Sequence, residues 1–124
     1  MEIRNLGRCG LQVSLVGLGC NNFGGRLDLA ATRKVVHRAL DLGITLFDTA
    51  DTYGERGRSE EYLGESLGDR RKDIVLATKF GMAMHDAGTR KGASRRYILS
   101  AVEASLQRLK TDWIVMFPVT KSMA

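Results

Sequence analysis

The 124-residue chain alternates short apolar runs with longer amphipathic segments, and glycines separate many of them. Apolar positions that recur every three or four residues predict helices, whereas short uninterrupted apolar runs predict buried strands. The predicted helices cover residues 29–42, 60–67 and 95–110. The predicted strands cover residues 15–19, 44–47 and 74–78, with a fourth apolar run over 113–117. Residues 2–14 alternate weakly around a glycine-bearing turn, which predicts a hairpin.

Side chains that cap helices precede all three predicted helices: Asp28, Ser59 and Ser94. Glu60 and Glu61 would lie in the first turn of the second helix, where they interact favourably with the helix dipole. Gly43 and Gly68 stand where glycine commonly ends a helix. Strands that alternate with helices predict a parallel α/β sheet. Both an open doubly wound sheet and a barrel fit this order, and periodicity does not separate them.

Composition narrows the class of protein. The formal net charge is +5, but basic and acidic residues are interspersed and no nucleic-acid motif accompanies them, which favours a solvated surface over nucleic-acid binding. The chain has no apolar run near the roughly 20 residues that a membrane span needs, and its start lacks a signal peptide, so we expect a cytoplasmic protein. Cys9 and Cys20 are expected to stay reduced. With His37 and His85, they lack the spacing of a metal site.

Polar side chains follow the predicted strands at one edge of the sheet, where ligands bind in parallel α/β folds. Asp48 and Tyr53 follow the second strand, and Lys79 follows the third. An ammonium near a tyrosine makes it a stronger acid, and a carboxylate holds the lysine charged, so the set suits protonation of a carbonyl oxygen. Each residue alone also has an ordinary explanation in capping, packing or solvation. Gly17–Gly25 lacks the third glycine of a dinucleotide-binding loop and does not run directly into a helix.

Several segments together resemble the aldo-keto reductase family, in its branch related to potassium-channel β subunits and bacterial sugar-aldehyde reductases. Residues 47–54 (Phe-Asp-Thr-Ala-Asp-Thr-Tyr-Gly) are similar to the family signature, and 77–81 (Ala-Thr-Lys-Phe-Gly) to its lysine strand. Residues 6–14, 57–64 and 102–112 resemble further family blocks in the same order. The resemblance implies a (β/α)8 TIM barrel, of which this chain is the N-terminal half with a leading hairpin.

The resemblance also implies the chemistry. Tyr53 matches the general acid that protonates the carbonyl, Lys79 the residue that strengthens this acid, and Asp48 the carboxylate paired with the lysine. Gly19, Cys20 and Asn21 match a loop near the nicotinamide, and Asp48 is expected to lie near the cofactor as well. The implied cofactor is NADPH, or NADH, without a metal. The implied substrates are small aldehydes and ketones.

The similarity stops after Ile114. Thr120 stands where the family has a catalytic histidine, and Pro118 falls inside a predicted strand although it lacks a backbone N–H. We therefore expect a partial barrel over 1–114 and a divergent tail over 115–124, as a shifted reading frame or a gene remnant would produce. The chain has about half of the roughly 250 residues of such a barrel.

Two classes of function remain open. One is a truncated reductase, which is expected to self-associate through an exposed strand edge. The other is an inactive fragment or a non-enzymatic binding module.

Overall fold

The structure is a computed structural model that describes residues 1–84 and 91–118. An antiparallel hairpin of β1 (Ile3–Asn5) and β2 (Gln12–Ser14) comes first, as predicted. The four parallel strands that follow are β3 (Gly17–Gly19), β4 (Leu46–Asp48), β5 (Val75–Phe80) and β6 (Val115–Pro118). The helices between them are α1 (Leu29–Asp41), α2 (Tyr53–Leu67), the short 3-10 helix η1 (Gly68–Asp73) and α3 (Arg95–Leu109).

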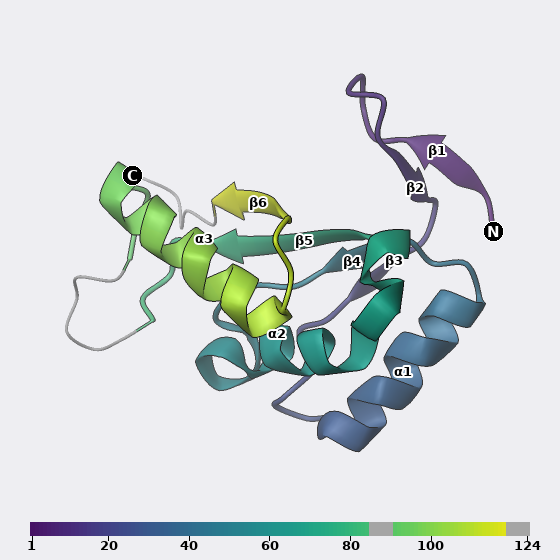
Figure 1. Ribbon diagram of the computed structural model, residues 1–124, viewed down its shortest axis with the longest axis horizontal. Helices are drawn as coiled ribbons and strands as arrows, with labels where there is room; N and C mark the ends of the chain where they lie inside the picture. Colours follow the sequence, from purple (N-terminus) through teal and green to yellow (C-terminus); the bar gives the residue numbers. More distant parts are fainter. Residues whose placement is uncertain (85–90, 119–124) are drawn as a thin grey trace.

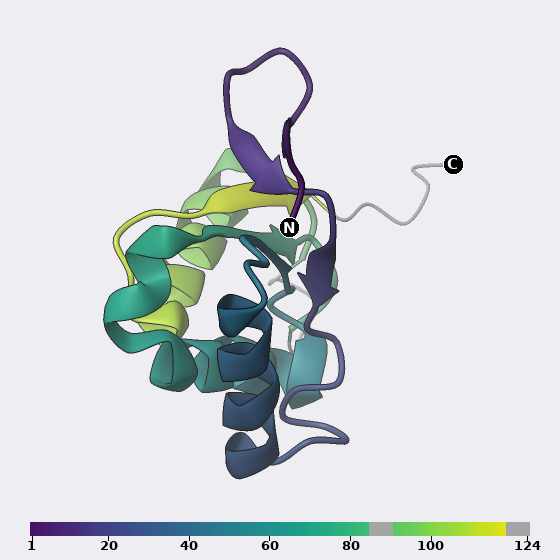
Figure 2. The ribbon, with the colours of Figure 1, turned by 90° about the vertical axis from the view of Figure 1, so that its right-hand side faces the viewer.

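The strand order β3-β4-β5-β6 is the order along the chain. Helices α1, α2 and α3 all lie on one side of this sheet, and the hairpin projects away from them (Figures 1 and 2). In a doubly wound sheet the strand order reverses and helices cover both faces, whereas a barrel keeps sequential order with helices outside. The arrangement is therefore that of a partial (β/α)8 barrel, which confirms the predicted fold class.

The two faces of the sheet differ because successive side chains of a strand point to opposite sides. On the face toward the helices, Leu18, Phe47 and Leu76 belong to the main hydrophobic cluster. The helices contribute Val36, Ala39, Leu40, Leu63, Leu67 and Leu109 to the same cluster. Asp48 and Lys79 alternate with these apolar residues, so they lie on the face that the helices leave open.

Close contacts fix the later elements on this core. Helices α2 and α3 approach so closely at Gly64 that an added Cβ would lie 2.5 Å from the Arg108 carbonyl oxygen, which explains the glycine. Arg71 of η1 places its guanidinium 4.0 Å from the centre of the Trp113 ring and donates a hydrogen bond to the Trp113 carbonyl. It also donates to the Ile74 carbonyl at 3.2 Å. Arg71 thus joins the segment before β6 to the start of β5.

Most predicted helix ends are confirmed. The Asp28 carboxylate accepts a hydrogen bond from the backbone N–H of Ala31, and the Ser94 hydroxyl accepts one from Tyr97. The predicted cap of the second helix was wrong. Helix α2 spans Tyr53–Leu67, but Gly54, Glu55, Arg56 and Gly57 are non-helical, so its regular part begins close to the predicted start. Ser59 is fully buried there and does not cap the helix.

Strand β6 begins directly after Ile114, two residues later than the predicted run over 113–117, and pairs in parallel with β5. Pro118 is its last residue, and β6 is an edge strand of the described sheet, where proline is tolerated. The boundary after residue 114 stays a prediction. Thr120 and His85 lie outside the described residues. No helix in the described ranges is long and apolar enough to cross a membrane.

Candidate active site

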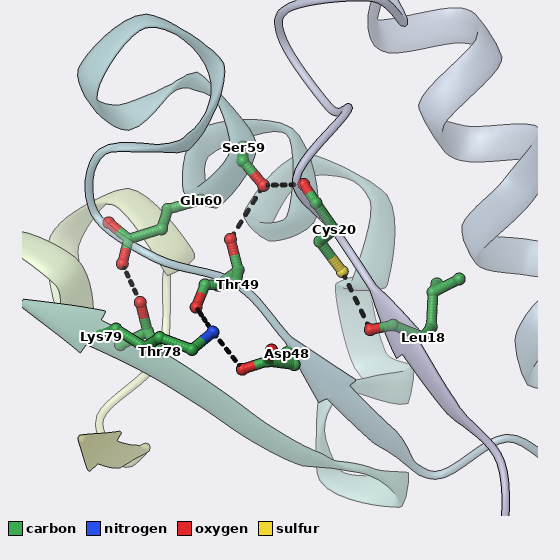
Figure 3. Close-up of polar contacts among 8 residues, drawn as sticks. All are labelled: Leu18, Cys20, Asp48, Thr49, Ser59, Glu60, Thr78 and Lys79. Carbon is green, nitrogen blue, oxygen red and sulfur yellow. Dashed lines mark hydrogen bonds and ion pairs between the residues drawn. The ribbon is translucent and has the colours of Figure 1, made fainter. Parts of the chain in front are cut away.

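The structure brings Asp48, Tyr53 and Lys79 together at the carboxyl edge of the sheet. Lys79 Nζ donates a hydrogen bond to Asp48 Oδ1 at 2.5 Å and another to the Thr49 carbonyl oxygen at 2.9 Å (Figure 3). The same ammonium lies 5.3 Å from the centre of the Tyr53 ring, within cation–π range. The side chain of Lys79 is 21% exposed and that of Asp48 48% exposed, so the group is open to solvent on one side.

The backbone that carries these side chains continues the sheet ladder past the strand ends. The Cys20 N–H donates to the Asp48 carbonyl, the Thr49 N–H to the Ala77 carbonyl, and the Asp51 N–H to the Lys79 carbonyl, at 2.9–3.0 Å. These bonds hold the loop that leads to Tyr53 against β5. These backbone bonds place Asp48 and Lys79 on neighbouring strands at the same edge of the sheet.

Tyr53 is followed by a left-handed turn. Gly54, Glu55 and Arg56 all have φ between 61° and 70°, and Gly57 has φ 136°. An added Cβ at Gly54 would lie 2.3 Å from the Phe23 carbonyl oxygen, so this position accepts no side chain. Left-handed backbone costs a non-glycine residue roughly 1–2 kcal/mol. The turn is thus a strained segment that places Tyr53 at the carboxyl edge of the sheet, beside Asp48 and Lys79. We call this edge the rim.

Glu55 offers a test of this strain. The Glu55→Gly variant is expected to be more stable than Glu55→Ala by roughly 1 kcal/mol, because glycine adopts the left-handed conformation without steric cost. In an ordinary helix interior the order is reversed, with alanine better by about 1 kcal/mol. Both variants lose the exposed Glu55–Arg58 ion pair, so its contribution cancels. Urea denaturation gives the sign, and a more stable alanine variant would show that the turn is not left-handed.

The loop after β3 carries the residues expected near a cofactor. Gly19 and Asn21 are exposed, whereas Cys20 is fully buried between them, so its thiol faces the core. Burial raises the pKa of the Cys20 thiol to about 12, and the nearby Asp48 charge adds to this against a lowering backbone hydrogen bond. Cys9 and Cys20 are both free thiols. Burial therefore favours the neutral thiol, and the backbone of Cys20 bonds to the Asp48 carbonyl and the Ser59 hydroxyl.

Ser59 connects the ends of β3 and β4 behind the rim. Its hydroxyl donates to the Cys20 carbonyl oxygen at 2.7 Å. Because that bond uses the hydroxyl's one hydrogen, Thr49 Oγ1 must be the donor in the 2.8 Å bond between Thr49 and Ser59 (Figure 3). Thr49 is the residue whose carbonyl binds Lys79. Ser59, which was predicted to cap a helix, thus connects the ends of two strands through buried hydrogen bonds.

A buried charge network that the sequence did not predict lies beside these hydrogen bonds. Glu60 is fully buried and accepts hydrogen bonds from Thr78 Oγ1 at 2.5 Å, Ser105 Oγ at 2.8 Å and Arg108 Nε at 2.6 Å. The sequence held one signal for this burial, because helical spacing places Glu60 on the same face as Leu63, Gly64 and Leu67. All four residues are buried in the structure. Glu60 therefore belongs to the inner face of α2 and not to a solvated first turn.

Asp51 is a second buried carboxyl near this network, with 3% exposure. Burial raises the pKa of Asp51 from 3.8 to about 6, and repulsion by Glu60 adds to the rise. Attraction by Arg108 and a backbone hydrogen bond from Thr52 oppose it. Folding therefore favours the neutral form of the Asp51 carboxyl over its charged form.

The Asp51→Asn variant is expected to stabilise the chain near pH 8 and to change little near pH 4. Since the folded pKa of Asp51 lies above its ordinary value, its stabilising contribution is present below pH 3.8 and is lost as the pH rises through about 6. Asparagine stays neutral, so we expect the free energy of unfolding of the variant to be about 1–3 kcal/mol higher at high pH. Urea denaturation across this pH range measures the difference, with the exposed Asp69→Asn as control. A gain for Asp51→Asn that is equal at all pH values would contradict the assignment.

The family model described as "Aldo/keto reductase family" matches residues 15–119. Uncharacterized oxidoreductase YqkF of Bacillus subtilis (strain 168) is 44% identical over 119 residues, which cover 94% of this chain and 38% of that protein. A probable voltage-gated potassium channel subunit beta of Arabidopsis thaliana is 38% identical over 121 residues, which cover 92% of this chain and 35% of that protein.

Solved structures agree with these matches. Aldo-keto reductase AKR11C1 from Bacillus halodurans, in its holo form, superposes with a TM-score of 0.81 at 41% identity. The superposition covers 92% of this chain and 38% of that one. The chain thus spans 35–38% of the length of these three proteins.

Proposed function

Because the chain belongs to the aldo/keto reductase family of oxidoreductases, we propose that it supplies the acid–base groups of a site that reduces aldehydes or ketones with NADPH. The observation that carries the proposal is the contact of the Lys79 ammonium with both the Asp48 carboxylate and the Tyr53 ring. A lysine, a carboxylate and a tyrosine in this arrangement suit proton donation to a carbonyl oxygen.

The residues of the rim fit a nicotinamide ring. A Cβ built on Gly19 would meet only Asn21 Oδ1, at 4.0 Å, so the loop after β3 leaves open space above the sheet edge. Asn21 is exposed and Asp48 is half exposed, and both can form hydrogen bonds with a carboxamide or ribose. Gly19, the Cys20 backbone, Asn21 and Asp48 are therefore the proposed cofactor-binding groups. The cofactor, when bound, supplies the hydride.

The chain's own residues handle the proton. Tyr53 donates its hydroxyl proton to the substrate oxygen as the carbonyl carbon receives the hydride, so the O–H bond of Tyr53 breaks while that of the alcohol forms. The Lys79 ammonium stabilises the phenolate that remains. Asp48 and the Thr49 carbonyl hold this ammonium in place.

The proposal is tested by titrating the purified chain into NADPH, following the cofactor's fluorescence, and then adding aliphatic, aromatic or sugar-derived aldehydes. We expect saturable binding and aldehyde-dependent oxidation of NADPH. Gel filtration of the same sample records whether the active species is an association of chains. An absence of binding with NADPH on the order of a millimolar, the upper end of ordinary enzyme–substrate affinities, would favour the non-enzymatic alternative for this chain.

A further inference from the structure

A buried path of hydrogen bonds runs from α3 through Glu60 to the residue beside Lys79. Arg108 and Ser105 of α3 bind the Glu60 carboxylate at 2.6 and 2.8 Å. Glu60 in turn accepts a 2.5 Å hydrogen bond from Thr78, which is fully buried on β5 (Figure 3). The carboxylate therefore ties two helices to the strand that carries the lysine.

We propose that Glu60 is a positioning residue for Lys79, acting through Thr78. Thr78 and Lys79 are consecutive on β5, so their side chains point to opposite faces of the sheet. The Thr78 hydroxyl faces the helices and Lys79 faces the rim. Fixing the Thr78 side chain fixes the rotation of this strand end, and with it the direction in which Lys79 leaves the backbone.

The two hydrogen bonds of Lys79 depend on the orientation of its backbone. Its ammonium reaches two acceptors on β4 and the following loop, Asp48 Oδ1 and the Thr49 carbonyl oxygen, at 2.5 and 2.9 Å. A long, flexible lysine side chain can keep both hydrogen bonds only when its backbone is held in one orientation. The Thr49 acceptor is fixed independently by Ser59, so Glu60 governs the donor side of the contact and Ser59 the acceptor side.

The inference rests on the proposed function only for the catalytic meaning of Lys79. The geometric effect can be measured without turnover. A short pulse of acetic anhydride acetylates free lysine amines, and mass spectrometry gives the extent of reaction at Lys79 relative to the exposed Lys34 in the same molecule. An ammonium held in the Asp48 and Thr49 contacts reacts slowly, and one released from them reacts faster.

Thr78→Val removes the hydroxyl and keeps the shape of the side chain. We expect it to raise the relative acetylation of Lys79 about fivefold, which is the effect of losing one ordinary hydrogen bond. Thr78→Ser restores the donor and should return the reactivity to that of the unmodified chain. Ser105→Ala is the matched structural control, because it removes a bond to the same Glu60 oxygen from the α3 side and leaves the Thr78 bond in place.

Circular dichroism establishes that each variant is folded. Should Thr78→Val fail this check, Glu60→Asp withdraws the carboxylate from Thr78 while it keeps the charge, and the same increase at Lys79 is expected. Unchanged Lys79 reactivity in a folded variant that lacks the Glu60–Thr78 bond overturns the inference, as does an equal increase in Ser105→Ala. Since the assay contains neither NADPH nor carbonyl substrate, a failure of the proposed function leaves these outcomes readable.

Discussion

Replacing Tyr53 with phenylalanine is expected to lower NADPH-dependent carbonyl reduction about a hundredfold to ten-thousandfold, the range typical of losing a general acid. The change removes the hydroxyl that is proposed to donate the proton. The ring stays, and with it the 5.3 Å contact with the Lys79 ammonium. The loss should therefore appear in kcat, while the affinity for NADPH stays the same.

Absorbance of NADPH gives the rate, and a fluorescence titration gives the affinity. Tyr62→Phe is the matched control, because Tyr62 lies on the same helix without a place in the rim, and it should retain full activity. Equal losses in the two variants would mean that a tyrosine on α2 matters for stability and that Tyr53 is not the acid.

Replacing Glu60 with alanine is expected to lower the free energy of unfolding by about 3–5 kcal/mol, the usual cost of breaking a buried ion pair by removing one partner. The Arg108 side chain, 20% exposed, would lose the carboxylate that balances its charge. The buried hydroxyls of Thr78 and Ser105 would lose their acceptor as well. A buried donor without a partner adds to the cost because it cannot return to water.

Urea denaturation measures this loss. The neighbouring Glu61 is exposed, so Glu61→Ala should change stability by no more than about 0.5 kcal/mol and serves as the control. A Glu60→Ala variant as stable as the control would mean that the carboxylate is solvated in solution, which would also remove the basis of its action on Lys79.

The order of strands and helices was predictable because the periodicity of apolar residues follows burial directly. Caps Asp28 and Ser94 were predictable for a similar reason, since a single side chain meets a single backbone N–H. The start of α2 was not. Its first turn is left-handed, and that conformation depends on the close approach of the Phe23 carbonyl to Gly54, a contact between segments far apart in the sequence.

The candidate site divides in the same way. Asp48 and Lys79 could be placed at one edge because both directly follow or end a predicted parallel strand. The positions of Ser59 and Glu60 depend on which face of α2 is buried. The sequence predicts a helix cap at Ser59 and a favourable dipole interaction at Glu60, because hydroxyl and acidic side chains commonly have these roles at a helix start. Only the packing of α2 against α3 and β5 reveals the partners of Glu60.

One continuous part of the chain contains the left-handed turn, the hydrogen bonds of Ser59 and the Glu60 network. The described side-chain hydrogen bonds around Asp48 and Lys79 come from residues between Leu18 and Arg108, and the strand that carries Lys79 also pairs with β6. The candidate site and its supporting contacts thus lie in one continuous segment of the chain, which runs from β3 to β6. A change of sequence outside this segment would therefore leave the described surroundings of Asp48, Tyr53 and Lys79 intact.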